Sequence, residues 1–140
     1  MIARRQRGMA LIEALVAAVL LAIGLIGVIG LQARSQGALA DAGMRAEAVI
    51  AANRLLGTMA VDQANLASYA LAATGTPSAR LQPWVDETRA HIPGAGMLVT
   101  VGAAADGRTR VAVTISWARK SGTAANAHSV VAYLAPAASS

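Results

Sequence analysis

Cysteine and phenylalanine are absent from the 140 residues, and aromatic residues make up only 3% of the chain. Because there is no cysteine, disulfides, thiolate metal sites and cysteine nucleophiles are excluded. Hydrophobic residues nonetheless reach 56%, and most of them are alanine, valine and leucine. This composition favours helices and a thin sheet over a core of large rings, and the length is enough for one small domain.

The surplus of positive charge is concentrated at one end of the chain. There are 12 basic and 7 acidic residues, and three of the basic residues are Arg4, Arg5 and Arg7. The rest of the chain is nearly balanced and has no basic stripe interleaved with aromatic residues, so nucleic acid is not an expected partner. The two histidines, His91 and His128, lack the spacing of metal ligands, and neither a metal nor another cofactor is expected.

Catalytic patterns are also missing. The sequence has no phosphate-binding loop, no Ser/His/Asp constellation and no carboxylate pair at a catalytic spacing. Asp86 and Glu87 are adjacent and would point to different faces of a helix, so we interpret them as charges in the first turn of a short helix that begins near Pro83. Trp84, in the same helix, is expected to anchor the core. The chain is therefore predicted not to be an enzyme.

A long segment without charge follows the basic N-terminus. The twenty residues from Ala14 to Ala33 are uncharged, and as a helix they would extend about 30 Å, the thickness of the hydrocarbon core of a bilayer. The arginines before this segment predict a cytoplasmic N-terminus, with the rest of the chain outside. Glu13 lies at the start of the segment, where a charge is costly and usually functional.

Three interpretations of this N-terminus compete. A secretory signal cut after Ala38-Leu39-Ala40 is one, but the apolar run exceeds the usual length of about 7–15 residues. A plain transmembrane anchor accounts for the length and orientation but not for Glu13. A class III signal, cut after Gly8 on the cytoplasmic side, accounts for the basic residues, the glycine, the glutamate and the length together, and it leaves the apolar helix on the protein.

The residues around Gly8 resemble the prepilin motif: basic residues, the glycine, the run Met9-Ala10-Leu11-Ile12-Glu13 and then an apolar segment. The resemblance implies that prepilin peptidase cuts between Gly8 and Met9, that the amino group of Met9 is methylated, and that Glu13 takes part in subunit assembly. Met9 stands where the family usually has phenylalanine. The resemblance also implies a single pass through the lipid of the bacterial inner membrane, a periplasmic C-terminal domain and later incorporation into a pilus.

Three further stretches resemble minor pilins known as type IV pilus modification proteins, the PilV type. They are AIGLIGVIGLQARS (22–35), W…IPGAG (84–96) and VAVTISW (111–117). The resemblance implies an α+β pilin fold, with a long N-terminal helix packed on a small antiparallel sheet. It implies a minor pilin that initiates or modifies pilus assembly with other minor pilins and the major pilin. Two alternatives stay open, a minor pseudopilin of type II secretion and a membrane-anchored periplasmic binding domain.

Four segments are expected along the chain: a basic leader (1–8), a transmembrane and assembly helix (9–33), an amphipathic continuation of that helix (34–60) and a small globular α+β domain (61–140). Apolar residues at helical spacing in the continuation predict a stripe that lies against a sheet. Asp41 and Arg45 would form a pair on its outer face. The stripe consists of Ala42, Ala46, Val49, Asn53, Leu56 and Ala60.

Alternating apolar residues predict antiparallel strands in the C-terminal third. One strand contains Val99 and Val101, and the next contains Val111 and Val113. A two-residue Asp-Gly turn between them would put the two apolar rows on opposite faces of the sheet. A three-residue loop, with Gly107 in the left-handed conformation, pairs Val101 with Val111 and puts both rows on one face, so this register is predicted. A third strand is expected after a polar loop.

Overall fold

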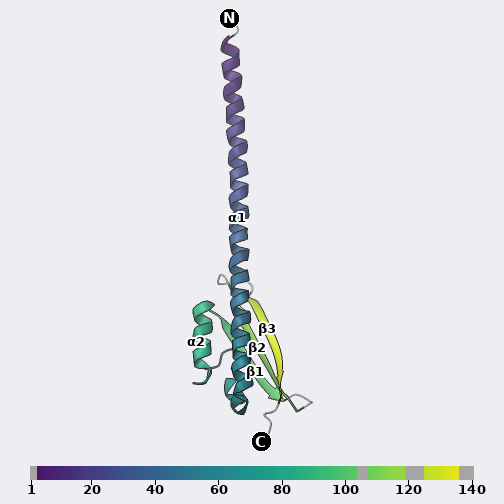
Figure 1. Cartoon of the computed structure of the whole chain (residues 1–140). Coiled ribbons are helices and arrows are strands. Elements are labelled where there is room, and N and C mark those ends of the chain that lie inside the picture. The colour runs from purple at the N-terminus through teal and green to yellow at the C-terminus, as the bar shows by residue number, and fades with distance from the viewer. Residues whose placement is uncertain (1–2, 104–106, 119–124, 136–140) are drawn as a thin grey trace. The chain divides into compact units, whose positions relative to one another are not determined.

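The computed structural model describes residues 3–103, 107–118 and 125–135, with side chains from Met9 onward. The chain divides into two compact units, Met1–Ala40 and Asp41–Ser140, and helix α1 (Ala3–Val61) contributes to both. The predicted α+β class, with a long N-terminal helix and a small antiparallel sheet, is confirmed (Figure 1). The elements after α1 are η1 (Gln63–Tyr69), α2 (Gln82–His91), β1 (Gly96–Ala103), β2 (Thr109–Trp117) and β3 (Asn126–Leu134).

The first unit is helical from Ala3 onward, and its described side chains form no buried face. Every side chain from Met9 to Gln36 is exposed, and the large apolar side chains up to Leu31 are between 50% and 74% exposed. This helix is long and apolar enough to cross a membrane, a test that an N-terminal signal sequence would also pass. A helix that is apolar on all sides requires lipid or other helices around it.

The second unit contains a three-stranded antiparallel sheet in the order β1-β2-β3. Val101 lies opposite Val111 and Val99 opposite Val113, so the predicted register is confirmed. Gly107 has a φ of 77°, the left-handed conformation expected for the end of the loop. Residues 104–106 of the loop lie outside the described residues. The hairpin therefore keeps the apolar rows of both strands on the same face.

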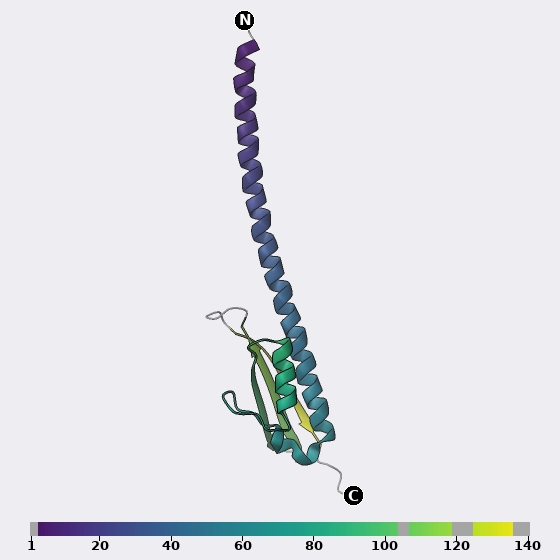
Figure 2. The ribbon, with the colours of Figure 1, turned by 90° about the vertical axis from the view of Figure 1, so that its left-hand side faces the viewer.

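The core lies on the face of the sheet that the helices cover. Every second residue of β2 is buried, as are Met97 and Val99 of β1. Figure 2 shows α2 beside the C-terminal part of α1, and both helices contribute to the same core as the strands. Trp84 is buried in this core, as predicted. The opposite face of the sheet carries the exposed side chains of Leu98, Val131 and Tyr133.

The buried stripe of α1 is one residue out of step with the predicted stripe. Leu55 and Met59 are at most 1% exposed, and a shift of one residue turns a helix by about 100°. Alanine occurs on all sides of this helix and marks no face, whereas burial of the larger Leu55 and Met59 removes more apolar area from water. The other buried members are Ala48 and Ala52. The predicted members that are exposed are Ala42, Ala46, Asn53 and Ala60.

The predicted position of Asp41 on the outer face is wrong. Its Oδ1 accepts hydrogen bonds from Trp117 Nε1 at 3.0 Å and from Asn126 Nδ2 at 2.7 Å. Arg45, one turn further along α1, lies with its guanidinium 6.0 Å from the centre of the Trp117 ring. The carboxylate therefore holds α1 to the ends of β2 and β3, because two buried or half-buried donors from those strands need an acceptor.

The predicted role of Asp86 and Glu87 as first-turn charges is also wrong. Helix α2 begins at Gln82, with Pro83 in its first turn, and its first turn contains no acidic residue. Asp86 accepts a hydrogen bond from Gln82 Nε2 at 2.7 Å, and Glu87 forms an ion pair with Arg54 of α1. The two carboxylates point to different partners, as expected for adjacent helical residues.

Asp62 organises the segment that follows α1. Its carboxylate accepts hydrogen bonds from Asn65 Nδ2 at 2.6 Å, from Tyr69 Oη at 2.7 Å and from Arg80 Nη1 at 2.7 Å. These partners come from η1 and from the loop before α2. A single carboxylate thus joins η1 to the loop before α2 through three side chains.

Acid is expected to weaken the second unit through Asp62. The hydrogen bonds from Asn65 and Tyr69, and the charge of Arg80, hold the pKa of Asp62 below its ordinary value of 3.8. The folded-state pKa is the lower one, so the carboxylate stabilises the fold above pH 3.8 and loses this contribution as the pH falls through the folded-state value. Asp62→Asn should therefore reduce the loss of stability in acid.

Urea unfolding of the full-length chain in detergent, between about pH 6 and pH 3, tests this expectation. Glu87 has a pKa lowered by its hydrogen bond with Arg54, and it should give the Asp62→Asn variant a residual acid dependence. Equal pH dependence in the variant and the original chain would show that Asp62 has no such role.

Candidate processing and assembly site

The predicted site residues Gly8, Met9 and Glu13 all lie in the continuous helical backbone of α1. Met9 and Glu13 are four residues apart, so they share one face of the helix and are separated by about 6 Å along its axis. Met9 is 74% exposed and Glu13 is also exposed. From Met9 to Gln36 the described side chains are all exposed, so a peptidase can reach this face of the helix.

Glu13 has no partner among the side chains described from Met9 onward: neither a hydrogen bond nor an ion pair involves it. The next charged residue along the chain is Arg34, about 31 Å away along a straight helix. The carboxylate therefore begins an apolar segment that offers it no compensating charge. In lipid or among apolar helices, its partner must come from the N-terminal end of the segment or from another molecule.

Three glycines interrupt the apolar segment at intervals of three residues. Gly24, Gly27 and Gly30 are exposed, and a Cβ added at any of them would meet no atom within 4 Å. Packing within the chain therefore does not require glycine at these positions, although each glycine lowers helix stability by about 1 kcal/mol relative to alanine. Small residues of this kind allow close approach between neighbouring membrane helices.

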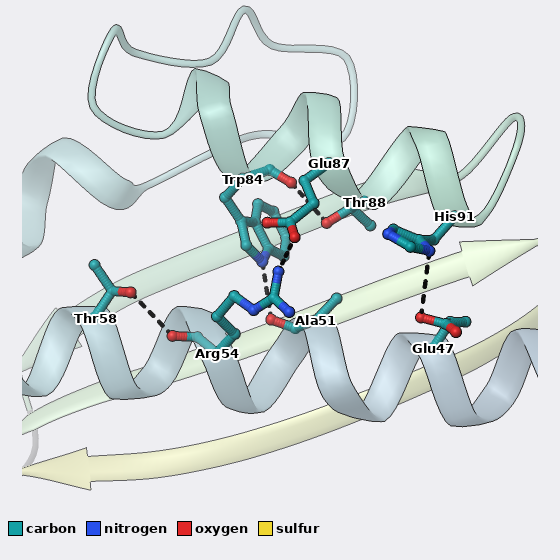
Figure 3. Close-up of polar contacts among 8 residues, drawn as sticks. All are labelled: Glu47, Ala51, Arg54, Thr58, Trp84, Glu87, Thr88 and His91. Carbon is teal, nitrogen blue, oxygen red and sulfur yellow. Dashed lines mark hydrogen bonds and ion pairs between the residues drawn. The ribbon is translucent and has the colours of Figure 1, made fainter.

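The second unit has a groove between α1 and α2, with a volume of about 210 Å³ (Figure 3). Trp84 Nε1 donates a hydrogen bond of 2.8 Å to the backbone carbonyl of Ala51, and Thr88 Oγ1 donates one of 2.7 Å to the carbonyl of Trp84. These bonds satisfy the polar atoms of two buried side chains. They identify Trp84 as an anchor of α2 on α1.

Two side-chain contacts cross the same groove, the ion pair of Arg54 with Glu87 and the approach of His91 to Glu47. Arg54 bonds to Glu87, and His91 Nδ1 lies 3.8 Å from Glu47 Oε2. The Arg54 hydrogen bond lowers the pKa of Glu87, and the same bond raises the pKa of Arg54. Sequence reasoning missed both pairs because their members are far apart in the chain. In the sequence, only the opposite charges of residues on two predicted helices could have indicated these contacts.

The charges of Arg54 and Glu87 neutralise one another across the groove. Among the described residues, no group of three or more histidine, cysteine, aspartate or glutamate side chains could hold a metal ion. The polar groups of the groove are used in joining α2 to α1.

Comparison with known proteins gives a match at the N-terminus. The family described as the prokaryotic N-terminal methylation motif matches residues 3–29, which include Gly8, Met9, Glu13 and most of the apolar segment. No curated protein and no solved structure matches the chain. The match identifies a type IV pilin-like signal, and the α+β arrangement of a long helix and a small sheet is consistent with the pilin fold.

The motif indicates a more particular class: a pilin-like or pseudopilin-like protein that is processed by prepilin peptidase. Together with the apolar helix, it indicates attachment to the inner membrane. Cleavage between Gly8 and Met9, methylation of Met9 and an assembly role for Glu13 stay predictions at the level of single residues.

Proposed function

We propose that this chain is a minor pilin of the type IV pilus modification (PilV) type, which helps to initiate or modify pilus assembly. The observation that carries the proposal is the coincidence of the methylation motif with a helical segment, Met9 to Gln36, whose side chains are all exposed. Such a helix can lie in the membrane before assembly and among the helices of other subunits afterwards. The resemblance of three further stretches to the PilV type supports the finer assignment.

Assembly would depend on a charge that processing creates. Cleavage after Gly8 frees the α-amino group of Met9, and a terminal amine, with an ordinary pKa of about 8, is largely cationic at neutral pH. Glu13 lies one turn further along the helix. When two subunits stack with a small axial offset, Glu13 of one subunit can reach the Met9 amine of its neighbour. Contacts of this head-to-tail kind propagate into helical filaments, and the ion pair would enforce the register between subunits.

The proposal assigns the protein no catalytic activity. It is a substrate of prepilin peptidase and a structural subunit, with the major pilin, other minor pilins and membrane lipid as partners. The second unit would lie in the periplasm before assembly and on the pilus afterwards, where it presents a surface to neighbouring subunits.

Processing is tested by intact-mass measurement of the chain extracted from membranes of its own host. We expect a chain that begins at Met9 and carries the mass of one added methyl group. A chain that begins at Asp41 would instead identify an ordinary secretory signal. An uncut chain would identify a plain anchor and would favour a membrane-attached periplasmic binding domain. Gly8→Glu should abolish cleavage, because the motif that this chain resembles has glycine directly before the scissile bond.

The same motif occurs in minor pseudopilins of type II secretion, so processing does not separate this alternative. Deletion of the gene separates the two. If the chain is a minor pilin of the proposed type, its deletion should reduce the number of surface pili and leave secretion unchanged. Loss of secreted enzymes with normal piliation would identify a pseudopilin. The neighbouring genes, encoding pilus or secretion components, provide an independent comparison.

A further inference from the structure

Strand β3 forms an edge of the sheet that lacks the usual protection against pairing. Its nine residues, Asn126–Leu134, contain no lysine, arginine, aspartate, glutamate or proline, and its register with β2 is continuous, without a bulge. Among the described residues, β3 pairs with β2 alone. Natural proteins usually blunt free edges with charges, proline, bulges or short strands, and β3 is longer than the typical five or six residues.

The hydrogen bonds of the opposite edge show which groups of β3 are free. Val99 exchanges both backbone hydrogen bonds with Leu71, at 2.9 Å each, so its N–H and C=O point away from β2. Val113, opposite Val99, then points toward β3 and bonds Val130. The alternation leaves the N–H and C=O of Ser129 and Val131 pointing outward, as it does those of Ala127 and Tyr133.

A side-chain contact supports this assignment. Thr114 and Ser129 lie opposite each other, and their hydroxyl oxygens are 2.9 Å apart. Side chains come closest at the pairs of an antiparallel ladder that do not exchange backbone hydrogen bonds. Ser129 is therefore at such a pair with β2, and its own backbone groups face the free edge.

The two edges of the sheet differ. Edge β1 is partly occupied, because Leu71 forms a bridge with Val99 at the middle of the strand. Two glycines, Gly96 and Gly102, further weaken β1 as a template for pairing. Edge β3 has an outward row of donors and acceptors, flanked by the side chains of Val131 and Tyr133, which are 43% and 53% exposed. An extended backbone can pair with such a row through main-chain hydrogen bonds.

Identical copies of the chain do not fit this edge well. Two β3 strands paired antiparallel about a two-fold axis would place their Trp117 ends, and hence their Asp41 contacts, at opposite ends of the joined sheet. Asp41 is the first residue of the second unit, so the two chains would enter the joined sheet at opposite ends, whereas chains anchored in one membrane would enter it from the same side. A head-to-tail contact between β3 and β1 of the next copy would keep the orientation, but Leu71 occupies that β1 edge.

We infer that β3 accepts an extended, uncharged strand from a different polypeptide, a subunit of the same assembly, and thereby lengthens the sheet by one strand. This mode of recognition uses main-chain hydrogen bonds for affinity and alternate side chains for specificity. The donor strand would place apolar residues next to the half-buried Val130 and Leu134 on the helix side. The inference rests on the proposed function, because the shared membrane orientation is what disfavours pairing between identical copies.

The experiment uses the full-length chain in its own host, with a photo-crosslinking benzoylphenylalanine in place of Tyr133. Val131→Pro removes one outward N–H, and proline is tolerated on edge strands at such positions. Val131→Thr is the matched control, because it keeps the N–H and the β-branched shape. We expect a crosslinked product with a second, different polypeptide, and we expect Val131→Pro to reduce it at least about tenfold, since the ring also blocks strand approach.

Thermal unfolding of each purified variant shows whether the fold is kept. If Val131→Pro does not fold, Val131→Lys takes its place, because a lysine on an edge disfavours pairing without removing a backbone group. A product of twice the chain's mass, a crosslink within the chain, or no product would overturn the inference. The inference would also be overturned if Val131→Pro and Val131→Lys both fold and the amount of crosslinked product does not change. The N-terminus is measured in the same samples, so an uncut Gly8–Met9 bond would refute the proposed function separately.

Discussion

Glu13→Ala protein should be inserted into the membrane and cleaved after Gly8, yet be nearly absent from sheared filaments. The carboxylate has no partner among the side chains described from Met9 onward, and the predicted cleavage site, the bond before Met9, is one turn away. In the filament, loss of Glu13 would leave the Met9 amine of a neighbouring subunit unpaired among apolar helices. Removal of one partner from a buried ion pair costs roughly 3–5 kcal/mol, which corresponds to at least about a hundredfold loss of incorporation.

The comparison of cleaved chain in the membrane fraction with chain in sheared filaments measures this effect. Glu13→Asp keeps the charge on a shorter side chain and should retain part of the incorporation, whereas Glu13→Gln should resemble Glu13→Ala. Leu11→Ala, two residues away on an exposed apolar position, is the matched control. If Glu13 only lies among lipid head groups and pairs with water, Glu13→Ala will enter filaments at the original level, and the charge will have no assembly role.

Trp117→Ala is expected to remove much of the stability of the second unit. Trp117 is 1% exposed, its indole N–H donates to Asp41, and the guanidinium of Arg45 lies over its ring. Replacement of a buried tryptophan by alanine costs about 3–5 kcal/mol. Since small domains are stable by about 5–15 kcal/mol in total, the variant should be partly unfolded at growth temperature and sensitive to proteases.

Urea unfolding of the full-length chain in detergent, followed by the fluorescence of Trp84, gives the change in free energy. Trp117→Phe keeps a buried ring but leaves the Asp41 carboxylate without one donor, so a smaller loss of about 1–3 kcal/mol is expected. Ile50→Ala, at a side chain that is 50% exposed, should change stability little. A loss below about 1 kcal/mol for Trp117→Ala would contradict the packing described for this residue.

These two variants separate the two units by function. Glu13→Ala should leave the folding of the second unit unchanged, because Glu13 lies in the first unit, Met1–Ala40. Trp117→Ala should leave cleavage after Gly8 unchanged, since the peptidase meets only the leader and the start of the apolar helix. A variant that failed in both assays would show a coupling between processing and folding that the proposed function does not contain.

The sequence by itself determined the features that depend on local pattern. Twenty uncharged residues after a basic leader require a membrane-length helix, and the matched motif over residues 3–29 is a local signal of the same kind. The alternation of valines determined the register of β1 and β2, because a slip of one residue would have turned an apolar row to water. Trp84 was identifiable as an anchor since so few large rings are available for the core.

Only the tertiary structure decided which side of α1 is buried and where its charges go. Because alanine lies on every side of the helix, the sequence did not distinguish the buried stripe from one shifted by a single residue. In the structure the larger side chains of Leu55 and Met59 are buried in the core. Asp41 was placed on the outer face by helical spacing, but the donors that claim it, Trp117 and Asn126, come from strands far along the chain. Helical periodicity predicts contacts only between residues three or four positions apart. A buried donor instead bonds to an acceptor in any element that the fold places within about 3 Å of it.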